Sequence, residues 1–277
     1  MSVTETREGE RDYVLGTHDE EIQRLGLQHR VWRTRATSAW RRAGFTVGQT
    51  LLDVGCGPGY GTLDLAEIVG PSGRVTGVDR SRRFLDVAGA RAKLRDLSNV
   101  DLVEMDLDEG ALPSIEADGA WARWVLAFVR RPRDLVGRIH AALKPGATLV
   151  LHEYVHYETW RLAPRCREHE AFVQMVIESW RENGGEPDVG IDLPRWLSEQ
   201  GFEVQAMRTF ADVVGPKDYS WQWPMAFIGS GLRRFVTLGK LSRERAAEME
   251  RTIVTASEQP NTWWVLPAVV EILARRI

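Results

Sequence analysis

From residue 50 onward, short apolar runs alternate with segments whose apolar residues recur every third or fourth position. Short runs rich in Val, Leu and Ile are typical of buried strands, and the longer periodic segments are typical of amphipathic helices. The pattern predicts strands at 50–54, 75–79, 100–106, 119–125 and 147–154, and helices at 60–69, 81–97 and 132–143. Such an alternation favours an α/β fold with a parallel sheet and right-handed crossovers.

Further elements are predicted at both ends of the chain. The segment 19–42 has apolar residues at roughly helical spacing and predicts one or two helices before the sheet. Residues 192–202 predict a helix that ends at a glycine, and 202–210 predict a sixth strand. The apolar segment 263–273 predicts the last strand, although Pro267 cannot donate a ladder hydrogen bond and favours an edge or a bulge.

Two long stretches interrupt the alternation, at about 158–190 and at 213–260. Both leave the sheet at the carboxyl ends of strands, where ligands bind in open α/β sheets, so we expect helical insertions that cover a pocket. Aromatic residues are frequent in both, which favours an apolar, ring-bearing ligand, although such side chains also pack lid helices against a core. The residues expected to contact this ligand are Tyr157, Trp160, Trp221, Trp223 and Phe227.

The composition indicates one domain with a lid. With 277 residues, 43 % of them hydrophobic, the chain can bury a sizeable core. We expect an N-terminal helical cap at 1–45, a core at 46–212 and 260–277 with an insertion at about 158–190, and a helical lid at 213–259. A formal charge of −3 provides no general attraction to nucleic acid or to an anionic membrane.

Cysteine content and the N-terminal residues bear on the compartment. The chain has two cysteines, and Cys56 lies in a glycine-rich segment that a disulfide partner could hardly reach. The N-terminus is polar and lacks the apolar core of a secretory leader, and no run of 18 apolar residues follows it. We therefore expect a cytoplasmic protein without a membrane partner.

The segment 50–59, TLLDVGCGPG, places a glycine-rich loop directly after the first predicted strand, and the second strand ends at Asp79. Glycines in this position allow sharp turns and a close approach of the backbone to a ligand, and an acid at the next strand end can bind both hydroxyls of a ribose. The dinucleotide spacing G-x-G-x-x-G does not fit in either frame. The spacing present is D-x-G-x-G-x-G, from Asp53 to Gly59.

This motif resembles motif I of the class I S-adenosylmethionine-dependent methyltransferases. The likeness continues in the family's order through VDLVEMDL at 100–107, DGAWARWVLAFV at 118–129 and LKPGATLVLHEY at 143–154. The general pattern is similar to the ubiquinone/menaquinone-type C-methyltransferases and to natural-product methyltransferases. The resemblance implies a doubly wound, Rossmann-like sheet of seven mostly parallel strands, the last of them antiparallel.

The resemblance also implies a cofactor, S-adenosylmethionine, with S-adenosylhomocysteine as the product. It places Asp53 near the amino group of the cofactor, Asp79 at the ribose and Asp106 at the adenine, while Arg123 and Trp124 line the methionine part. The residues expected to bind the cofactor are Asp53, Gly55, Cys56, Gly57, Gly59, Asp79, Arg80, Asp106, Leu107 and Arg123.

Catalytic candidates follow the fifth predicted strand, in HEYVHYETW at 152–160. Alternation along an extended segment puts His152, Tyr154 and His156 on one face, toward the pocket edge. An oxygen or nitrogen acceptor often needs a base, so these three residues are the catalytic candidates, and His156 is the first choice for that base.

Other positions offer fewer candidates. Many small-molecule members of the family have a histidine shortly after the fourth strand, where this chain has Ala127 and Phe128. Gln28 and His29 become candidates if the N-terminal helix closes over the site. The sequence has no paired cysteines, no H-x-x-x-H and no D-x-D-x-D spacing, so we expect no metal.

These features predict a methyltransferase that acts on a small, largely apolar or aromatic metabolite in secondary metabolism, with the acceptor atom (O, N or C) left open. One alternative uses the bound cofactor for a cyclisation or an elimination, and another is a catalytically inactive nucleoside-binding module. Nucleic-acid methylation is disfavoured, because the amino-methylating signature Asn/Asp-Pro-Pro-aromatic is absent. Lid aromatics are consistent with a homodimer, and equally with a lid that closes on the substrate.

Overall fold

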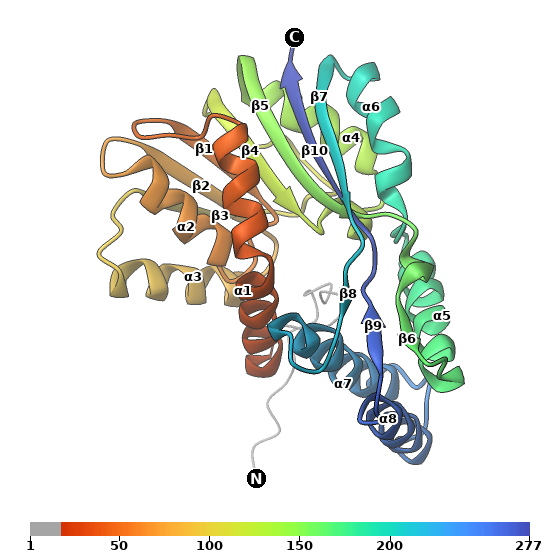
Figure 1. The fold of residues 1–277 in the computed structure, drawn as a ribbon. Helices are drawn as coiled ribbons and strands as arrows, with labels where there is room; N and C mark the ends of the chain where they lie inside the picture. Colours follow the sequence, from red (N-terminus) through yellow and green to blue (C-terminus); the bar gives the residue numbers. More distant parts are fainter. Residues whose placement is uncertain (1–17) are drawn as a thin grey trace.

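The computed structural model describes residues 18–277, so the first 17 residues of the expected cap lie outside the described part. Seven strands form one sheet in the order β3-β2-β1-β4-β5-β10-β7 (Figure 1). They are β1 Thr50–Val54, β2 Arg74–Asp79, β3 Val100–Glu104, β4 Ala117–Arg123, β5 Leu143–Tyr154, β7 Phe202–Phe210 and β10 Val269–Arg276. β1 to β5 pair in parallel, and β10 is antiparallel to both β5 and β7. The predicted Rossmann-like sheet with an antiparallel last strand is confirmed.

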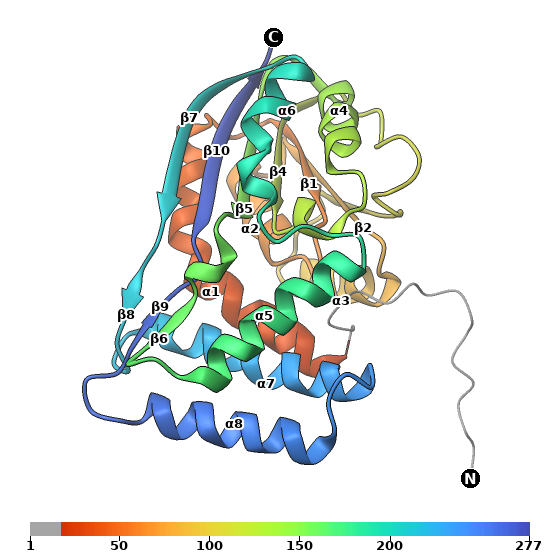
Figure 2. The ribbon, with the colours of Figure 1, turned by 90° about the vertical axis from the view of Figure 1, so that its right-hand side faces the viewer.

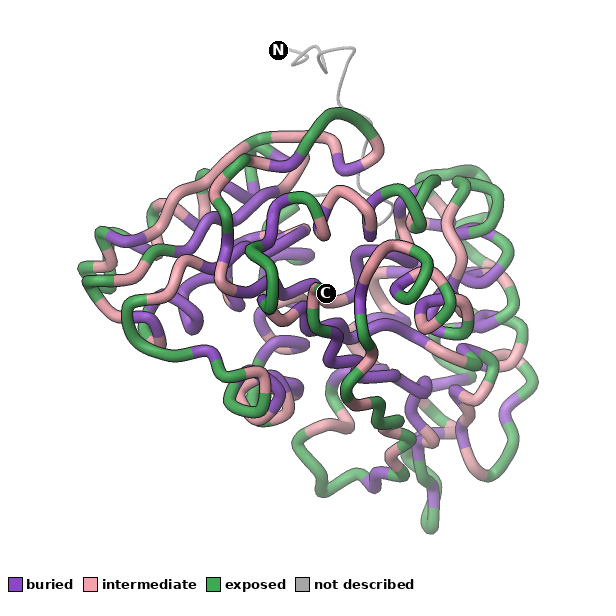
Figure 3. The backbone as a smooth tube through the Cα atoms, turned by 90° about the horizontal axis from the view of Figure 1, so that it is seen from above, coloured by how far each residue is buried: buried purple, intermediate pink, exposed green. Residues whose placement is uncertain are grey.

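Helices cover both faces of this sheet, as right-handed crossovers require. They are α1 Asp19–Arg42, α2 Tyr60–Val69, α3 Arg82–Leu94, α4 Pro132–Ala142 and α6 Leu193–Glu199. α1 and α2 share one apolar core, which includes Trp40 and Leu65, with the buried strands. α4 and α6 share a second core on the opposite face, which includes Leu135 and Leu197. Seen from above, buried residues follow the strands and the inner sides of the helices (Figure 3).

The prediction of one continuous strand at 263–273 is wrong, because its first half belongs to a different sheet. The chain instead forms β9 (Trp263–Val265), breaks at Pro267, and then forms β10. β9 pairs with β6 (Arg161–Ala163) and β8 (Val213–Val214) in a separate three-stranded sheet. The break has a physical reason, because proline has no amide hydrogen for the ladder and the flanking backbone bonds to other segments.

The two insertions form a helical layer beyond the carboxyl ends of the parallel strands (Figures 1 and 2). The first insertion contains α5 (Arg167–Glu182), and the second contains α7 (Gln222–Thr237) and α8 (Arg243–Ser257). A third core, rich in aromatic rings, joins these helices to the sheet edge. Among residues 18–277, no helix combines the length and the apolar character needed to cross a bilayer.

Trp32 of α1 connects the sheet to this helical layer. Its ring is 1 % exposed and meets the rings of Trp124, His152, Phe210 and Trp223 with centroids 5.3 to 5.9 Å apart. All four contacts are edge-on, the geometry that aromatic quadrupoles favour. One side chain therefore packs α1 against the ends of β4 and β5, against β7 and against α7.

Replacing this side chain should destabilise the whole assembly. We expect Trp32→Ala to lower the free energy of unfolding by about 3–5 kcal/mol, because it empties a closely packed aromatic site. Denaturant unfolding measures the change. Trp263→Ala is the matched control, because that ring is 47 % exposed and its loss should cost below about 1 kcal/mol. Equal losses in the two variants would contradict the assigned role of Trp32.

Candidate functional site

A cavity lies at the carboxyl ends of β1 to β4, with about 930 Å³ of open space including its mouth. The loops after these strands form its walls, and Leu25 and Gln28 of α1 cover it. Of the ten predicted cofactor residues, eight line it: Gly55, Cys56, Gly57, Asp79, Arg80, Asp106, Leu107 and Arg123.

The glycine loop between β1 and α2 forms one wall of the cavity. Gly55 has a φ of +67°, and a Cβ there would lie 2.4 Å from the Val125 side chain. Gly59 has a φ of +79°, and its Cβ would lie 2.5 Å from the Cβ of Ala88 in α3. Glycine is required at both positions by the backbone conformation and by the close neighbour. Gly59 itself does not line the cavity, so it acts through the packing of α3 against the loop.

Asp79 stands at the end of β2, on the wall next to the glycine loop. One carboxylate oxygen accepts from the Gly57 amide at 2.9 Å and the other from the Ser81 amide at 2.8 Å. Burial raises the pKa of this carboxyl. These two amides, together with a backbone hydrogen bond from Arg80, hold the group in one orientation, and the carboxylate keeps capacity to accept from a ligand hydroxyl.

Asp53 lies beneath the glycine loop and does not line the cavity. Its side chain is buried and accepts from the Thr62 hydroxyl at 2.7 Å, and burial raises its pKa to about 7. Asp106 follows β3 by two residues and lines the cavity, where its carboxylate accepts from the Asp108 amide at 2.9 Å. The predicted third strand therefore ends earlier than expected, at Glu104.

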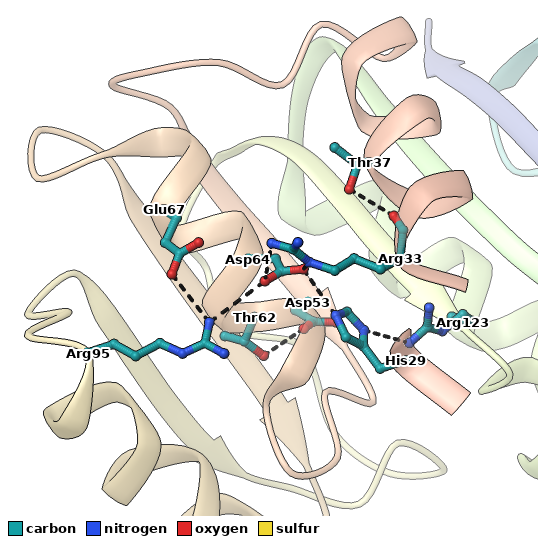
Figure 4. Close-up of polar contacts among 9 residues, drawn as sticks. All are labelled: His29, Arg33, Thr37, Asp53, Thr62, Asp64, Glu67, Arg95 and Arg123. Carbon is teal, nitrogen blue, oxygen red and sulfur yellow. Dashed lines mark hydrogen bonds and ion pairs between the residues drawn. The ribbon is translucent and has the colours of Figure 1, made fainter. Parts of the chain in front are cut away.

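α1 is attached over the cavity by polar contacts to α2. The Tyr60 hydroxyl donates to the Ile22 carbonyl at 3.0 Å, and the absence of a side chain on Gly26 leaves room for this ring. Asp64 of α2 binds two residues of α1, His29 at 3.0 Å and Arg33 at 2.6 Å (Figure 4). Because Asp64 is enclosed and doubly paired, these contacts fix the position of α1 on the core.

The three catalytic candidates are not brought together at the cavity. His152 is 0 % exposed, its Nε2 lies 3.1 Å from Glu271, and burial lowers its pKa to about 4. His156 has a left-handed backbone and a side chain that is 62 % exposed, beside Glu158. β5 ends at Tyr154, so the expected alternation does not extend to His156. Neither histidine lines the cavity.

Tyr154 lines a second, smaller pocket beneath the lid, with about 230 Å³ of open space including its mouth. Of the predicted substrate residues, Tyr157, Trp160, Trp223 and Phe227 also line it, and Trp221 does not. Tyr157, Trp160 and Trp223 are at most 3 % exposed, so they also serve as packing for the lid.

Trp124 separates the two pockets. It lines the larger cavity, and its ring stacks on Tyr154 at 5.2 Å and on Trp223 at 5.5 Å, both of which line the smaller pocket. Its φ of +53° is uncommon for a bulky residue and places the ring in this position.

Several lining residues were missed in the sequence. Tyr60 and Phe84 follow the two strand-end motifs closely, so a search of the first turns of the following helices could have found them. Leu25 comes from α1, and its place depends on tertiary packing. Among residues 18–277, no group of His, Cys, Asp or Glu is arranged to hold a metal ion.

Glu153 supports the turn that lines the cavity after β4. One of its carboxylate oxygens accepts from the amides of Val125 and Leu126 at 2.8 and 2.9 Å. The side chain is 0 % exposed, and burial raises its pKa to about 7. The ionised carboxylate therefore lowers the stability of the folded state, although its hydrogen bonds hold the turn.

The chain is similar to known methyltransferases in the part that contains the glycine loop. Residues 52–151 match a family described as a methyltransferase domain. A demethylmenaquinone methyltransferase of Staphylococcus aureus is 37 % identical over 130 residues, which is 46 % of this chain and 50 % of the relative. That of Lactococcus lactis is 31 % identical over 129 residues, or 47 % of this chain and 50 % of the relative. An uncharacterized 37.1 kDa protein in a Streptomyces fradiae transposon is 29 % identical over 160 residues, or 57 % and 44 % of the two chains. The chain thus spans about half the length of these relatives.

Solved structures show a similar fold at low sequence identity. A putative methyltransferase from Bacillus halodurans aligns with a TM-score of 0.61 at 17 % identity, over 88 % of this chain and 99 % of that one. Coclaurine N-methyltransferase bound to N-methylheliamine and SAH aligns at 0.57 and 17 %, over 88 % and 72 %. The [4+2]-cyclase SpnF aligns at 0.56 and 20 %, over 88 % and 80 %. These likenesses concern the fold.

The buried charge of Glu153 predicts a pH-dependent stability. Its pKa is raised from 4.5 to about 7 in the folded state, so between these values the folded protein retains a proton that the unfolded chain has lost. Stability is therefore lost as the pH rises from 4.5 through 7, by about 3 kcal/mol for this group. Glu153→Gln should remove the loss, so the variant gains stability over the wild type between pH 5 and pH 8.

Denaturant unfolding at several pH values measures this gain. Glu158→Gln is the control, because it makes the same substitution on the same segment at a side chain that is 47 % exposed. Parallel pH curves for wild type and Glu153→Gln would show that Glu153 is not a buried titrating group.

Proposed function

Because this chain belongs to the class I S-adenosylmethionine-dependent methyltransferases, we propose that it binds S-adenosylmethionine in the large cavity and methylates a small, largely apolar or aromatic metabolite. The observation that carries the proposal is the juxtaposition of the glycine loop and Asp79 on one wall of that cavity. The Gly57 amide donates directly to Asp79, so the two parts of the motif form one binding surface.

The described residues fit this cofactor. The left-handed glycines keep the loop free of side chains where a ligand approaches, and the Asp79 carboxylate can accept a hydrogen bond from a ribose hydroxyl. Asp106 and Leu107 line the neighbouring part of the cavity, where the adenine would lie. At the opposite side Arg123 offers a cation, whose pKa burial lowers to about 10, for an anionic group.

When bound, S-adenosylmethionine supplies an electrophilic methyl group together with its own leaving group, a thioether. The protein then has to align the acceptor and exclude water. Leu25 and Gln28 of α1 cover the cavity, and Trp124 and Phe128 form an apolar wall. No histidine is among the described lining residues, so an acceptor that is already nucleophilic, such as a phenolate or an enolic carbon, suits the site best.

The smaller pocket supports an apolar or aromatic acceptor. Five aromatic side chains and two prolines line it, and Trp124 separates it from the cofactor cavity by one ring. The names of the relatives, demethylmenaquinone methyltransferases, support quinol-like acceptors as the first class to test. We place the reaction in the cytoplasm, in secondary-metabolite biosynthesis, and the two free, buried cysteines support a reducing compartment.

Cofactor binding tests the proposal directly. We expect calorimetric titration to show S-adenosylhomocysteine binding and no NAD binding. Asp79→Ala should weaken the affinity by about 1–3 kcal/mol, or roughly 5- to 150-fold, because charge-assisted hydrogen bonds to the ribose are lost. Glu104→Ala is the matched control, an exposed acid at the end of the neighbouring strand β3. Unchanged affinity in Asp79→Ala would remove Asp79 from the site.

Methyl transfer tests the acceptor class. Radiolabelled S-adenosylmethionine should methylate at least one of three probes, namely 2-naphthol, a 1,4-naphthoquinol and an aromatic amine. Trp223→Ala should lower kcat/KM for that acceptor by roughly 10-fold or more through lost aromatic contact, and change S-adenosylhomocysteine affinity far less. Trp263→Ala is the control, because this residue lines neither pocket. Tight cofactor binding without any methylated product would favour the cyclisation, elimination or binding-module alternatives.

A further inference from the structure

Arg123 is a cation at the cavity wall with too few partners. It ends β4, and its guanidinium lies over the rings of Trp121 and Trp124, with its central carbon 5.7 and 5.2 Å from their centroids. Within residues 18–277 its hydrogen-bond partner is one ring nitrogen of His29, and its Nη1 is buried with no partner. Asp53 interacts with it through charge alone. A cation desolvated in this way is costly unless an anion completes the site.

His29 joins this cation to α2. Its Nε2 lies 3.0 Å from the Asp64 carboxylate, and its Nδ1 lies 3.2 Å from Nη2 of Arg123 (Figure 4). Asp64 also pairs with Arg33 and is therefore charged, so it accepts a hydrogen from Nε2. The Nδ1 lone pair is then free to accept from Arg123. The ring is stacked on Tyr60 at 5.7 Å, which fixes its plane.

The two sides of the cavity differ in the charge of their lining residues. Three acids (Asp79, Asp106 and Asp108) and one cation (Arg80) line it on the side of β2 and β3, and Arg123 lines it at β4. The excess of acids on the first side suits a neutral nucleoside with hydroxyl and amino donors and disfavours a carboxylate. The guanidinium of Arg123 suits a carboxylate, which it can bind through two parallel N–H donors.

We propose that His29 is a positioning residue, which holds the guanidinium of Arg123 in place to bind the α-carboxylate of the methionine part of S-adenosylmethionine. This inference rests on the proposed function. It adds an anion site at β4, with a support that spans α1 and α2, to the ribose and adenine contacts at β2 and β3.

The arrangement makes carboxylate binding sensitive to pH. The charged groups that face His29 are Asp64 of α2, Arg123 of β4 and Arg33 of α1, and burial among them lowers the pKa of the imidazole. The ring is neutral at pH 7. Protonation would place an N–H on Nδ1 against the guanidinium, which replaces a hydrogen bond by a repulsion between like charges.

Two ligands separate the carboxylate from the nucleoside. S-adenosylhomocysteine carries the amino-acid part, whereas 5′-methylthioadenosine has the same thioether nucleoside without it. We expect His29→Ala to weaken S-adenosylhomocysteine binding roughly 10-fold and 5′-methylthioadenosine binding less than about 2-fold. His29→Asn offers an amide oxygen toward Arg123 and should restore most of the affinity. His156→Ala is the matched control, because this histidine is exposed and does not line the cavity.

The pH profile is the second readout. In the wild type, S-adenosylhomocysteine should lose more affinity than 5′-methylthioadenosine once the pH falls far enough below 6.5 to protonate His29. In His29→Asn the ratio of the two affinities should stay constant. Equal losses for both ligands in His29→Ala would assign His29 a purely structural role and overturn the inference. Wild-type binding of S-adenosylhomocysteine no tighter than that of 5′-methylthioadenosine would also overturn it. Binding of neither ligand to the wild type would overturn the proposed function itself.

Discussion

The docking of α1 across the carboxyl ends of the strands is the interaction on which the site depends. Trp32 is buried among rings from β5, β7, α7 and the end of β4, so the helix packs against the sheet and the lid together. Its polar contacts to α2 lie on both sides of Trp32, at Ile22 and His29 before it and at Arg33 after it. Without this helix the cavity would lack its cover, and the guanidinium at β4 would lose its hydrogen-bond partner. The stability of the lid and the geometry of the proposed cofactor site therefore both depend on α1.

Buried polar groups are concentrated where the strands meet this helix. His152 and Glu271 form a hydrogen-bonded pair inside the sheet, and Arg42 of α1 also binds Glu271. Glu153, the next residue along β5, points to the other face and holds the turn after β4. Adjacent residues of one strand therefore perform opposite tasks, because successive side chains of a strand project from opposite faces. Both residues have structural roles, so the proposed chemistry involves the residues that line the cavity.

Aromatic residues in the two insertions act both as a core and as a lining. Their rings pack α5 and α7 on the sheet edge, and a subset encloses the smaller pocket beside Trp124. An apolar acceptor placed there would reach the cofactor cavity past a single ring. The proposed preference for an apolar acceptor therefore depends on the same aromatic contacts that pack the lid on the sheet.

The sequence alone determined the strand and helix order, the glycine loop and the acids at the strand ends, because these depend on local periodicity and on short motifs within one βαβ unit. Eight of the residues predicted from these motifs line one cavity for this reason. Tertiary structure decided the rest. His152 and Tyr154 lie on the same face of β5, yet α1 buries the first and the lid aromatics cover the second, while the end of the strand turns His156 into solvent. His29 meets Arg123 across 94 positions of sequence. Contacts of this kind depend on how separate elements pack, and no local pattern of residues encodes them.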